Sequence, residues 1–215
     1  KAGGIKVCKT HPEVEAAAGS LLGKKLVTHQ TGAAGKLCSK LYIEAGTDIA
    51  RELYLSFLID RSHERIIMVG SAQGGMEIER LAVTDPEAII KIHIEPAVGL
   101  QDFQARTMAF ALGLGEELLN HAVKTIKGCY RAVRDLDANI LEINPLVVTK
   151  NNELMALDAK MSFDENALFR RQKIAELRDK TQIDPREVAA AEAGLSYVGL
   201  DGDIGCMING AGLAM

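Results

Sequence analysis

Aromatic residues are scarce in this 215-residue sequence: they make up 4% of it, and tryptophan is absent. Aliphatic side chains must therefore fill the core. Basic runs are also missing, and the net charge of −4 at pH 7 disfavours nucleic-acid binding. No apolar run is long enough to span a membrane. With 47% hydrophobic and 25% charged residues, the composition is that of a soluble globular protein with one large domain or two small ones.

Cysteine and histidine motifs are missing too. The four cysteines lie far apart, without the pair spacing of a metal site: Cys8, Cys38, Cys129 and Cys206. We expect reduced, buried thiols in a cytosol-like compartment. None of the five histidines has a partner at the spacing of a metal or triad motif, so we expect structural roles for His11, His29, His63, His93 and His121.

Hydrophobic periodicity predicts a mixed α/β chain. Strands are expected at residues 4–10, 25–30, 41–45, 52–60, 65–71, 89–94, 140–149 and 154–161, and helices at residues 12–22, 78–83, 103–112 and 118–134. Later, Asp184 and Pro185 mark a helix start as N-cap and first helical residue. An apolar run at 204–208 leads into Asn209-Gly210-Ala211-Gly212, which predicts a strand, a turn and a helix opening an α/β domain. We place a domain boundary near residues 180–195.

The most informative segment is a predicted hairpin of two apolar strands that carry polar side chains. Glu142 and Asn144 are two residues apart, so on a strand they share a face. The returning strand can bring Asp158 opposite Asn144. These hard oxygen donors suit Mg²⁺ better than zinc, and Mg²⁺ is usual in phosphoryl-transfer sites. A turn cap or a bent edge strand would explain any one of the three, but not three polar groups on facing apolar strands.

Four glycine-containing loops are weaker candidates. Glu44-Ala45-Gly46-Thr47-Asp48 offers backbone groups suited to reading adenine, and Glu52 follows where an acid could bind ribose hydroxyls. From spacing alone, an ordinary loop between strands is the better explanation. Lys1-Ala2-Gly3-Gly4 and Ser71-Ala72-Gln73-Gly74-Gly75 suit flexible or phosphate-covering loops, although glycine pairs are weak signals. At residues 209–212, anion binding and close strand–helix packing explain the glycines equally well.

Segments in order along the whole chain resemble the β-subunit family of succinyl-CoA synthetase (succinate–CoA ligase). The matching segments are Lys-Ala-Gly-Gly at 1–4, Gly-Lys-Lys-Leu-Val-Thr at 23–28, Asp-Ile-Ala-Arg-Glu-Leu-Tyr-Leu at 48–55, Gly-Gly-Met-Glu-Ile-Glu at 74–79, Leu-Glu-Ile-Asn-Pro-Leu-Val at 141–147, Leu-Asp-Ala-Lys at 157–160, Ala-Leu-Phe-Arg at 167–170, Leu-Asp-Gly-Asp-Ile-Gly-Cys at 200–206 and Asn-Gly-Ala-Gly-Leu-Ala-Met at 209–215. Because the match runs without large gaps, it is more specific than any one motif.

The resemblance implies an ATP-grasp fold over residues 1–182. Residues 183–215 would then form a linker and the start of a flavodoxin-like CoA-ligase domain. The resemblance also implies site residues: Mg²⁺ ligands at Asn144 and Asp158, a catalytic acid at Glu142, nucleotide contacts from Glu44, Gly46, Thr47 and Glu52, and a substrate-side residue at Asn209.

The implied reaction is the reversible conversion of ATP, succinate and CoA to ADP, phosphate and succinyl-CoA in the tricarboxylic acid cycle, with GTP also possible as the nucleotide. The phosphoryl group passes through a histidine of a separate α subunit, which Glu142 would face. A related malate–CoA ligase β subunit and a non-catalytic interaction module are the alternatives. The implied location is the bacterial cytoplasm, or the mitochondrial matrix in a eukaryote.

Two departures from the family pattern concern the ends of the chain. The family's ATP-contacting lysine and a Gly-Arg-Gly segment would precede Lys1, and a later substrate-binding glycine loop would follow Met215. We therefore expect a fragment that binds nucleotide weakly and does not turn over by itself.

Overall fold

The computed structural model describes residues 4–27, 31–32, 35–200 and 202–214. The chain forms two units: residues 43–175, and residues 1–42 together with 176–215. Each is described here by itself. The predicted domain boundary at residues 182–183 stays a prediction.

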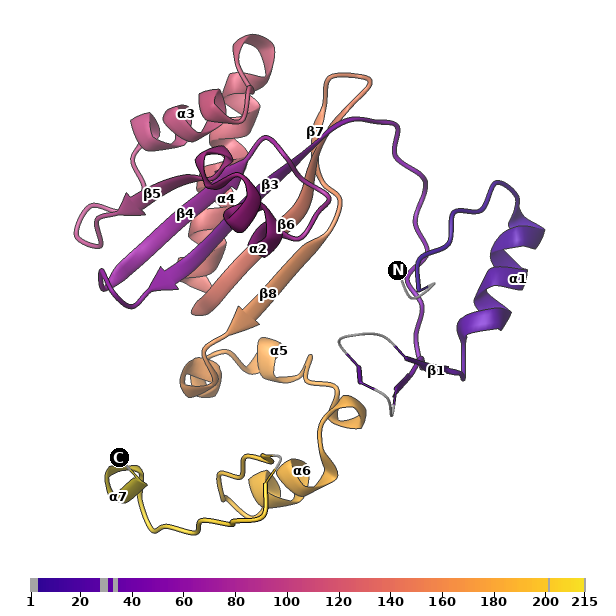
Figure 1. The fold of residues 1–215 in the computed structure, drawn as a ribbon, viewed down its shortest axis with the longest axis vertical. Helices are drawn as coiled ribbons and strands as arrows, with labels where there is room; N and C mark the ends of the chain where they lie inside the picture. Colours follow the sequence, from indigo (N-terminus) through magenta and orange to yellow (C-terminus); the bar gives the residue numbers. More distant parts are fainter. Residues whose placement is uncertain (1–3, 28–30, 33–34, 201, 215) are drawn as a thin grey trace. The chain divides into compact units, whose positions relative to one another are not determined.

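The larger unit is built on a six-stranded antiparallel sheet (Figure 1). Its strands are β3 (Ile49–Asp60), β4 (Arg65–Ser71), β5 (Ile90–Ile94), β6 (Ala138–Thr149), β7 (Leu154–Ala156) and β8 (Ala159–Phe163). They are ordered β5-β4-β3-β6, and both β7 and β8 pair with the outer side of β6. The two long central strands, β3 and β6, thus carry the sheet.

Helices and short 3₁₀ turns complete the larger unit. They are α2 (Ile78–Thr84), η1 (Pro86–Ala88), α3 (Asp102–Ala111), η2 (Glu116–Leu118), α4 (Leu119–Asp135), η3 (Glu165–Arg170) and α5 (Gln172–Ala175). Helix α3 begins with a reciprocal capping box between Gln101 and Gln104, which satisfies backbone donors at its start. The predicted helices at 78–83, 103–112 and 118–134 are therefore confirmed within a few residues.

The main core lies between one face of this sheet and helices α3 and α4. Strand residues such as Leu53, Leu55 and Phe57 alternate onto that face and are 0% exposed. Apart from Phe57, the fully buried large side chains there are aliphatic, as the composition predicted. The other face has a smaller apolar cluster around Tyr54, to which Ile78 of α2 contributes.

The smaller unit contains α1 (His11–Leu21), β1 (Lys25–Leu26), β2 (Lys36–Leu37), η4 (Lys180–Gln182), α6 (Pro185–Glu192) and α7 (Ala211–Ala214). None of its described residues is buried. Helix α6 begins as predicted: the Asp184 carboxylate accepts a hydrogen bond from the Arg186 backbone N–H at 2.8 Å, and Pro185 takes the first helical position. Across the described part of the chain, no helix is both long enough and apolar enough to cross a bilayer.

Three predicted strands are wrong: residues 4–10, 41–45 and 204–208 form none. Strand-like alternation needs a hydrogen-bonded neighbour to become a strand, and no described strand pairs with these segments. Ile5 and Ile204 are accordingly more than 85% exposed. The predicted strand at 154–161 is interrupted at Leu157 and Asp158.

The cysteines only partly follow the prediction. All four are free, as expected, but Cys206 is exposed and the others are half-buried. Burial raises the pKa of the Cys129 thiol to about 11, which keeps it protonated at neutral pH.

Candidate functional site

The sequence-predicted hairpin exists, and its register joins three strands around Glu142. On β6, Glu142 lies opposite Ser56 of β3 on one side and Lys160 of β8 on the other. The β6–β8 ladder pairs Ile143 with Ala159, and the β6–β7 ladder resumes at Leu146 and Ala156.

Both ladders share one register, and this register places Asn144 opposite Asp158. The backbone positions of the two predicted metal ligands therefore lie opposite each other, and Asn144 is two residues from Glu142 on β6. Their role as ligands stays a prediction.

Asn144 is fixed by the backbone of a distant loop. Its Oδ1 accepts a hydrogen bond from the Gly75 N–H at 2.9 Å, and its Nδ2 donates to the Met76 carbonyl at 2.9 Å. The peptide bond to Pro145 is cis, and the β3–β6 ladder has an irregularity here. The amide oxygen keeps a second lone pair, because one hydrogen bond uses only half of its accepting capacity.

The loop that holds Asn144 depends on two glycines. The Gly74 N–H donates to the Glu52 carbonyl at 3.0 Å, and a Cβ on Gly74 would lie 2.3 Å from the Leu53 carbonyl oxygen. Gly75 has φ +70°, and a Cβ there would lie 1.9 Å from Glu52 Oε2. The carboxylate of Glu52 therefore lies against the same loop that holds Asn144. The glycine pair is visible in the sequence, but its contact with Glu52 is not.

Three of the four predicted nucleotide-binding residues line one hollow of about 470 Å³. The lining residues are Glu44, Ala45, Gly46, Thr47, Asp48, Thr149, Asn151, Glu153 and Met155. The Lys150 N–H donates to the Asp48 carbonyl at 2.9 Å, which ties the 44–48 segment to the tip of the β6–β7 hairpin. Small-molecule sites typically have volumes of about 300–1,000 Å³. Glu52 lies outside this lining, on β3.

Polar groups extend along the sheet face that carries Glu142. Tyr54 and Ser56 of β3 are buried there, and burial raises the pKa of the Tyr54 hydroxyl. The Ser56 hydroxyl has no hydrogen-bond partner in the described structure. Glu142 is partly exposed, and Lys160 opposite it is exposed. Lys160 was not singled out as a site residue, although its register makes it a cationic neighbour of Glu142.

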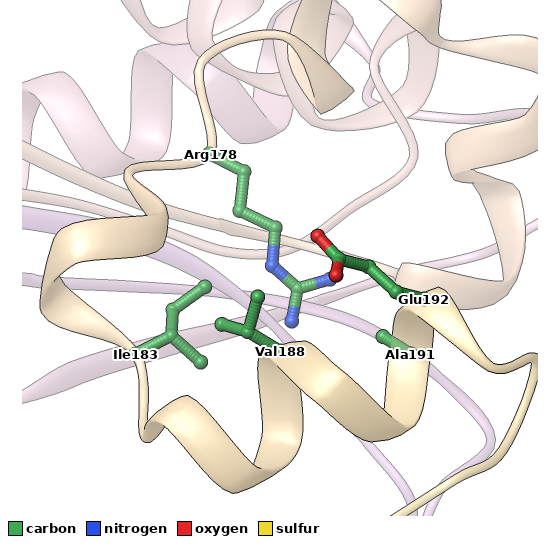
Figure 2. A pocket seen from close by; sticks show the side chains of 5 residues that line it. All are labelled: Arg178, Ile183, Val188, Ala191 and Glu192. Atoms are coloured by element: carbon green, nitrogen blue, oxygen red, sulfur yellow. The ribbon is translucent and has the colours of Figure 1, made fainter.

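Asn209, the predicted substrate-side residue, belongs to the smaller unit, where it is exposed and precedes α7. A separate pocket of about 190 Å³ in that unit is lined by Arg178, Ile183, Val188, Ala191 and Glu192. Its polar side chains, Arg178 and Glu192, extend toward each other across the apolar ones (Figure 2). None of the predicted site residues lines this pocket.

Comparison with protein-family models finds an ATP-grasp domain over residues 1–148. The chain is 60% identical over its full length to a probable malate–CoA ligase subunit β from Mesorhizobium japonicum. It is 53% identical, again over its full length, to the succinate–CoA ligase [ADP-forming] subunit β from Bacillus licheniformis. The chain spans 55% and 56% of the length of these two relatives.

A solved structure of ATP citrate lyase from Methanothrix soehngenii, in complex with citrate and coenzyme A, shares the fold. The TM-score is 0.58 at 17% identity, and the match covers 84% of this chain and 41% of that one. This likeness and the family match together confirm the predicted ATP-grasp fold.

Proposed function

The chain belongs to the ATP-grasp domain family, and on this premise we propose that it forms the nucleotide- and Mg²⁺-binding part of the β subunit of an acid–CoA ligase. The observation that carries the proposal is the shared register that sets Asn144 opposite Asp158, with Glu142 two residues away. The β-subunit relatives support the reaction class.

The donor atoms at Asn144 and Asp158 fit Mg²⁺. One is an amide oxygen with a free lone pair, and the other is a carboxylate; both are the hard oxygen ligands that this ion prefers. Bound there, Mg²⁺ would neutralise charge on the nucleotide phosphates. Asn144 is held in place by Gly75 and Met76, so this ligand is oriented before the ion arrives.

The hollow at residues 44–48 is the proposed base and ribose site. Gly46 leaves the backbone open to the adenine edge, and Glu44 and Thr47 lie in the same lining. Glu52 points to the Gly74–Gly75 loop, between this hollow and Asn144 along the β3 strand. We assign Glu52 to the ribose hydroxyls and ATP or ADP to the hollow; GTP is the alternative nucleotide.

Glu142 is the proposed catalytic acid for a phosphohistidine supplied by an α subunit. Its partly exposed position suits a group that meets another chain. A carboxylate there would hold the imidazole ring in the tautomer and orientation needed for phosphoryl transfer. Asn209 is assigned to the acid substrate, with CoA as the second substrate. The bacterial relatives support a cytoplasmic location.

The choice of acid has two candidates. Succinate is the expected substrate, but the higher identity to a probable malate–CoA ligase subunit, 60% against 53%, specifically favours malate. The complete β subunit, paired with its α subunit, should be assayed with both acids under the same conditions. The substrate with the larger kcat/KM is the physiological one in this account.

The nucleotide proposal is tested by calorimetric titration of the chain with ADP, with and without Mg²⁺. We expect Mg²⁺ to tighten binding, and Asp158→Ala to lose at least about tenfold of the Mg²⁺-dependent affinity. Asp135→Ala is the matched control, because Asp135 is exposed at the end of α4, which packs on the other face of the sheet. If Asp158→Ala keeps the wild-type dependence, the metal assignment is wrong. Failure of the wild-type chain to bind ADP would favour the non-catalytic interaction module.

A further inference from the structure

A trio of metal-ligating side chains lies at the other end of the same sheet face. The ligand atoms of Asp60, His63 and His93 all lie within 4.8 Å of one another. Asp60 Oδ2 is 2.7 Å from His63 Nδ1 and 3.1 Å from His93 Nε2. Elsewhere in the described ranges, no group of three His, Cys, Asp or Glu side chains brings its ligand atoms this close.

The trio is assembled by the fold. Asp60 ends β3, and His63 lies in the turn that leads to β4. His93 belongs to the edge strand β5, where it pairs with Ile67 of β4, which in turn pairs with Leu58. Side chains alternate along strands, so Leu58, Asp60 and His93 share the face that carries Ser56 and Glu142.

Local hydrogen bonds aim the ligand atoms. Asp60 Oδ1 accepts from the backbone N–H groups of Ser62 and His63, at 3.0 and 3.4 Å, which leaves Oδ2 facing the two rings. Gln104 of α3 donates to the His93 carbonyl at 3.0 Å and anchors that strand position. Such supporting contacts are what hold ligands in a productive orientation at known metal sites.

The distances between the ligand atoms are close to those around a tetrahedral zinc ion. Ligand atoms at about 2.0–2.1 Å from a tetrahedral Zn²⁺ are roughly 3.3 Å apart. The two observed contacts to Asp60 Oδ2 are 2.7 and 3.1 Å, and the ligand nitrogens of His63 and His93 lie within 4.8 Å of each other, so side-chain movements would bring all three atoms to this spacing. The side chains of His63 and His93 are 60% and 37% exposed, which leaves the site open to solvent.

The cation next to His63 in the following strand is already paired. The guanidinium of Arg65 pairs with Glu95 at 3.3 Å and donates from Nε to the His63 carbonyl at 2.9 Å, so its charge is balanced. Asp60 supplies the carboxylate oxygen, Oδ2, that faces both histidine rings. Two imidazoles and one carboxylate form a set that borderline metals such as Zn²⁺ prefer over Mg²⁺.

We propose that Asp60, His63 and His93 bind one divalent transition-metal ion, with Zn²⁺ as the best-fitting ion. Three protein ligands leave a fourth position for water. The ion would link the β3–β4 turn to the edge strand β5 and so stabilise one end of the sheet. This site is separate from the oxygen ligands at Asn144 and Asp158, and it does not depend on the proposed function.

The first test is calorimetry on untagged, chelator-stripped chain titrated with Zn²⁺ in the presence of a reductant. We expect one ion per chain, binding at least tenfold weaker in His93→Gln and in Asp60→Asn, and unchanged in His121→Gln. His121 is the matched control, because it is an exposed histidine on α4. Equal binding by all four proteins, or no wild-type binding, would overturn the proposal.

A second measurement uses only the wild-type chain, so it does not depend on whether a variant folds. Ring ¹⁵N resonances of the wild-type histidines are followed by NMR during Zn²⁺ addition. The proposal expects large shifts at His63 Nδ1 and His93 Nε2 and small ones at His11 and His121. With Co²⁺ as the probe, tetrahedral absorption bands without thiolate charge transfer would support it. Shifts confined to other histidines, or a thiolate band, would overturn it.

Discussion

Two clusters on one face of the sheet differ in donor chemistry and in the way the chain builds them. The proposed Mg²⁺ ligands, Asn144 and Asp158 beside Glu142, form an all-oxygen set within one hairpin. Asp60 joins two histidines from a turn and an edge strand. Asp60 lies four residues along β3 from Ser56, the residue opposite Glu142, which is roughly 13 Å at strand spacing. One sheet can thus carry two proposed cation sites of different donor type. The register of a hairpin places residues that are close in sequence, and the strand order of the sheet places residues that are distant in sequence.

The oxygen cluster depends on a close backbone approach that the histidine cluster lacks. Gly74→Ala would force a Cβ to 2.3 Å from the Leu53 carbonyl oxygen. We expect a loss of about 3 kcal/mol in the free energy of unfolding, measured with urea, because backbone must move.

Gly128→Ala is the control for this substitution. A Cβ at Gly128, inside α4, meets nothing within 4 Å, so we expect a gain of about 0.5–1 kcal/mol from helix propensity. Equal effects at both glycines would show that the 74–76 loop does not pack on β3 as described.

The hydrogen bonds that hold Asn144 against the 74–76 loop can be removed with a single substitution. Asn144→Ala deletes its hydrogen bonds to Gly75 and Met76 and should cost about 1–2 kcal/mol of stability. Hydrogen exchange at the Gly75 amide should also become faster. Asn139→Ala, at an exposed position on the same strand, should change neither quantity, and a matching change there would contradict the contact.

Asp137 is a carboxylate that forms ordinary ion pairs with two arginines, in contrast to the proposed metal ligand Asp60. Arg171 and then Arg170 lower the pKa of its carboxyl below the ordinary value of 3.8. A carboxyl with a lowered folded-state pKa adds stability above its unfolded pKa, and this stability is lost as the pH falls below about 4. Asp137→Asn should therefore flatten the loss of stability seen in unfolding curves from pH 5 down to pH 2. Its Zn²⁺ affinity should equal wild type; a large drop would place the metal elsewhere.

The smallest expected effect is at Ser56, between the two clusters. Its buried hydroxyl has no partner in the described structure, so Ser56→Ala should change the free energy of unfolding by less than about 0.5 kcal/mol, or stabilise the protein. Ser71 is equally buried, but its Oγ accepts from the Gln73 N–H at 3.1 Å. Ser71→Ala should cost about 1 kcal/mol, and a larger cost at Ser56 would mean that a partner exists.

The sequence predicted those features that depend on local pattern. The helices at 103–112 and 118–134 were predicted because apolar residues recur along them every three to four positions. The strands at 52–60 and 140–149 were predicted because each is an apolar run next to turn residues. Asn144 and Asp158 were predicted to face each other because a short hairpin fixes its own register. The strands at 4–10 and 204–208 failed because an alternating pattern does not specify a partner strand.

Contacts between distant positions were not predictable. Gly75 meets Asn144 across 69 positions in the chain, and nothing in either local sequence specifies this pairing. His63 and His93 were assigned separate structural roles because no motif joins them. The strand order β5-β4-β3 brings them to Asp60, and a single sequence does not reveal that order.

The most direct test of two separate cation sites is one NMR experiment on the wild-type chain with two additions. Mg²⁺ with ADP should shift the side-chain amide of Asn144 and the backbone amide of Gly75, and leave the rings of His63 and His93 unchanged. Zn²⁺ alone should shift those two rings and leave Asn144 and Gly75 unchanged. If both additions shift the same residues, or Mg²⁺ with ADP leaves Asn144 and Gly75 unmoved, the account is contradicted.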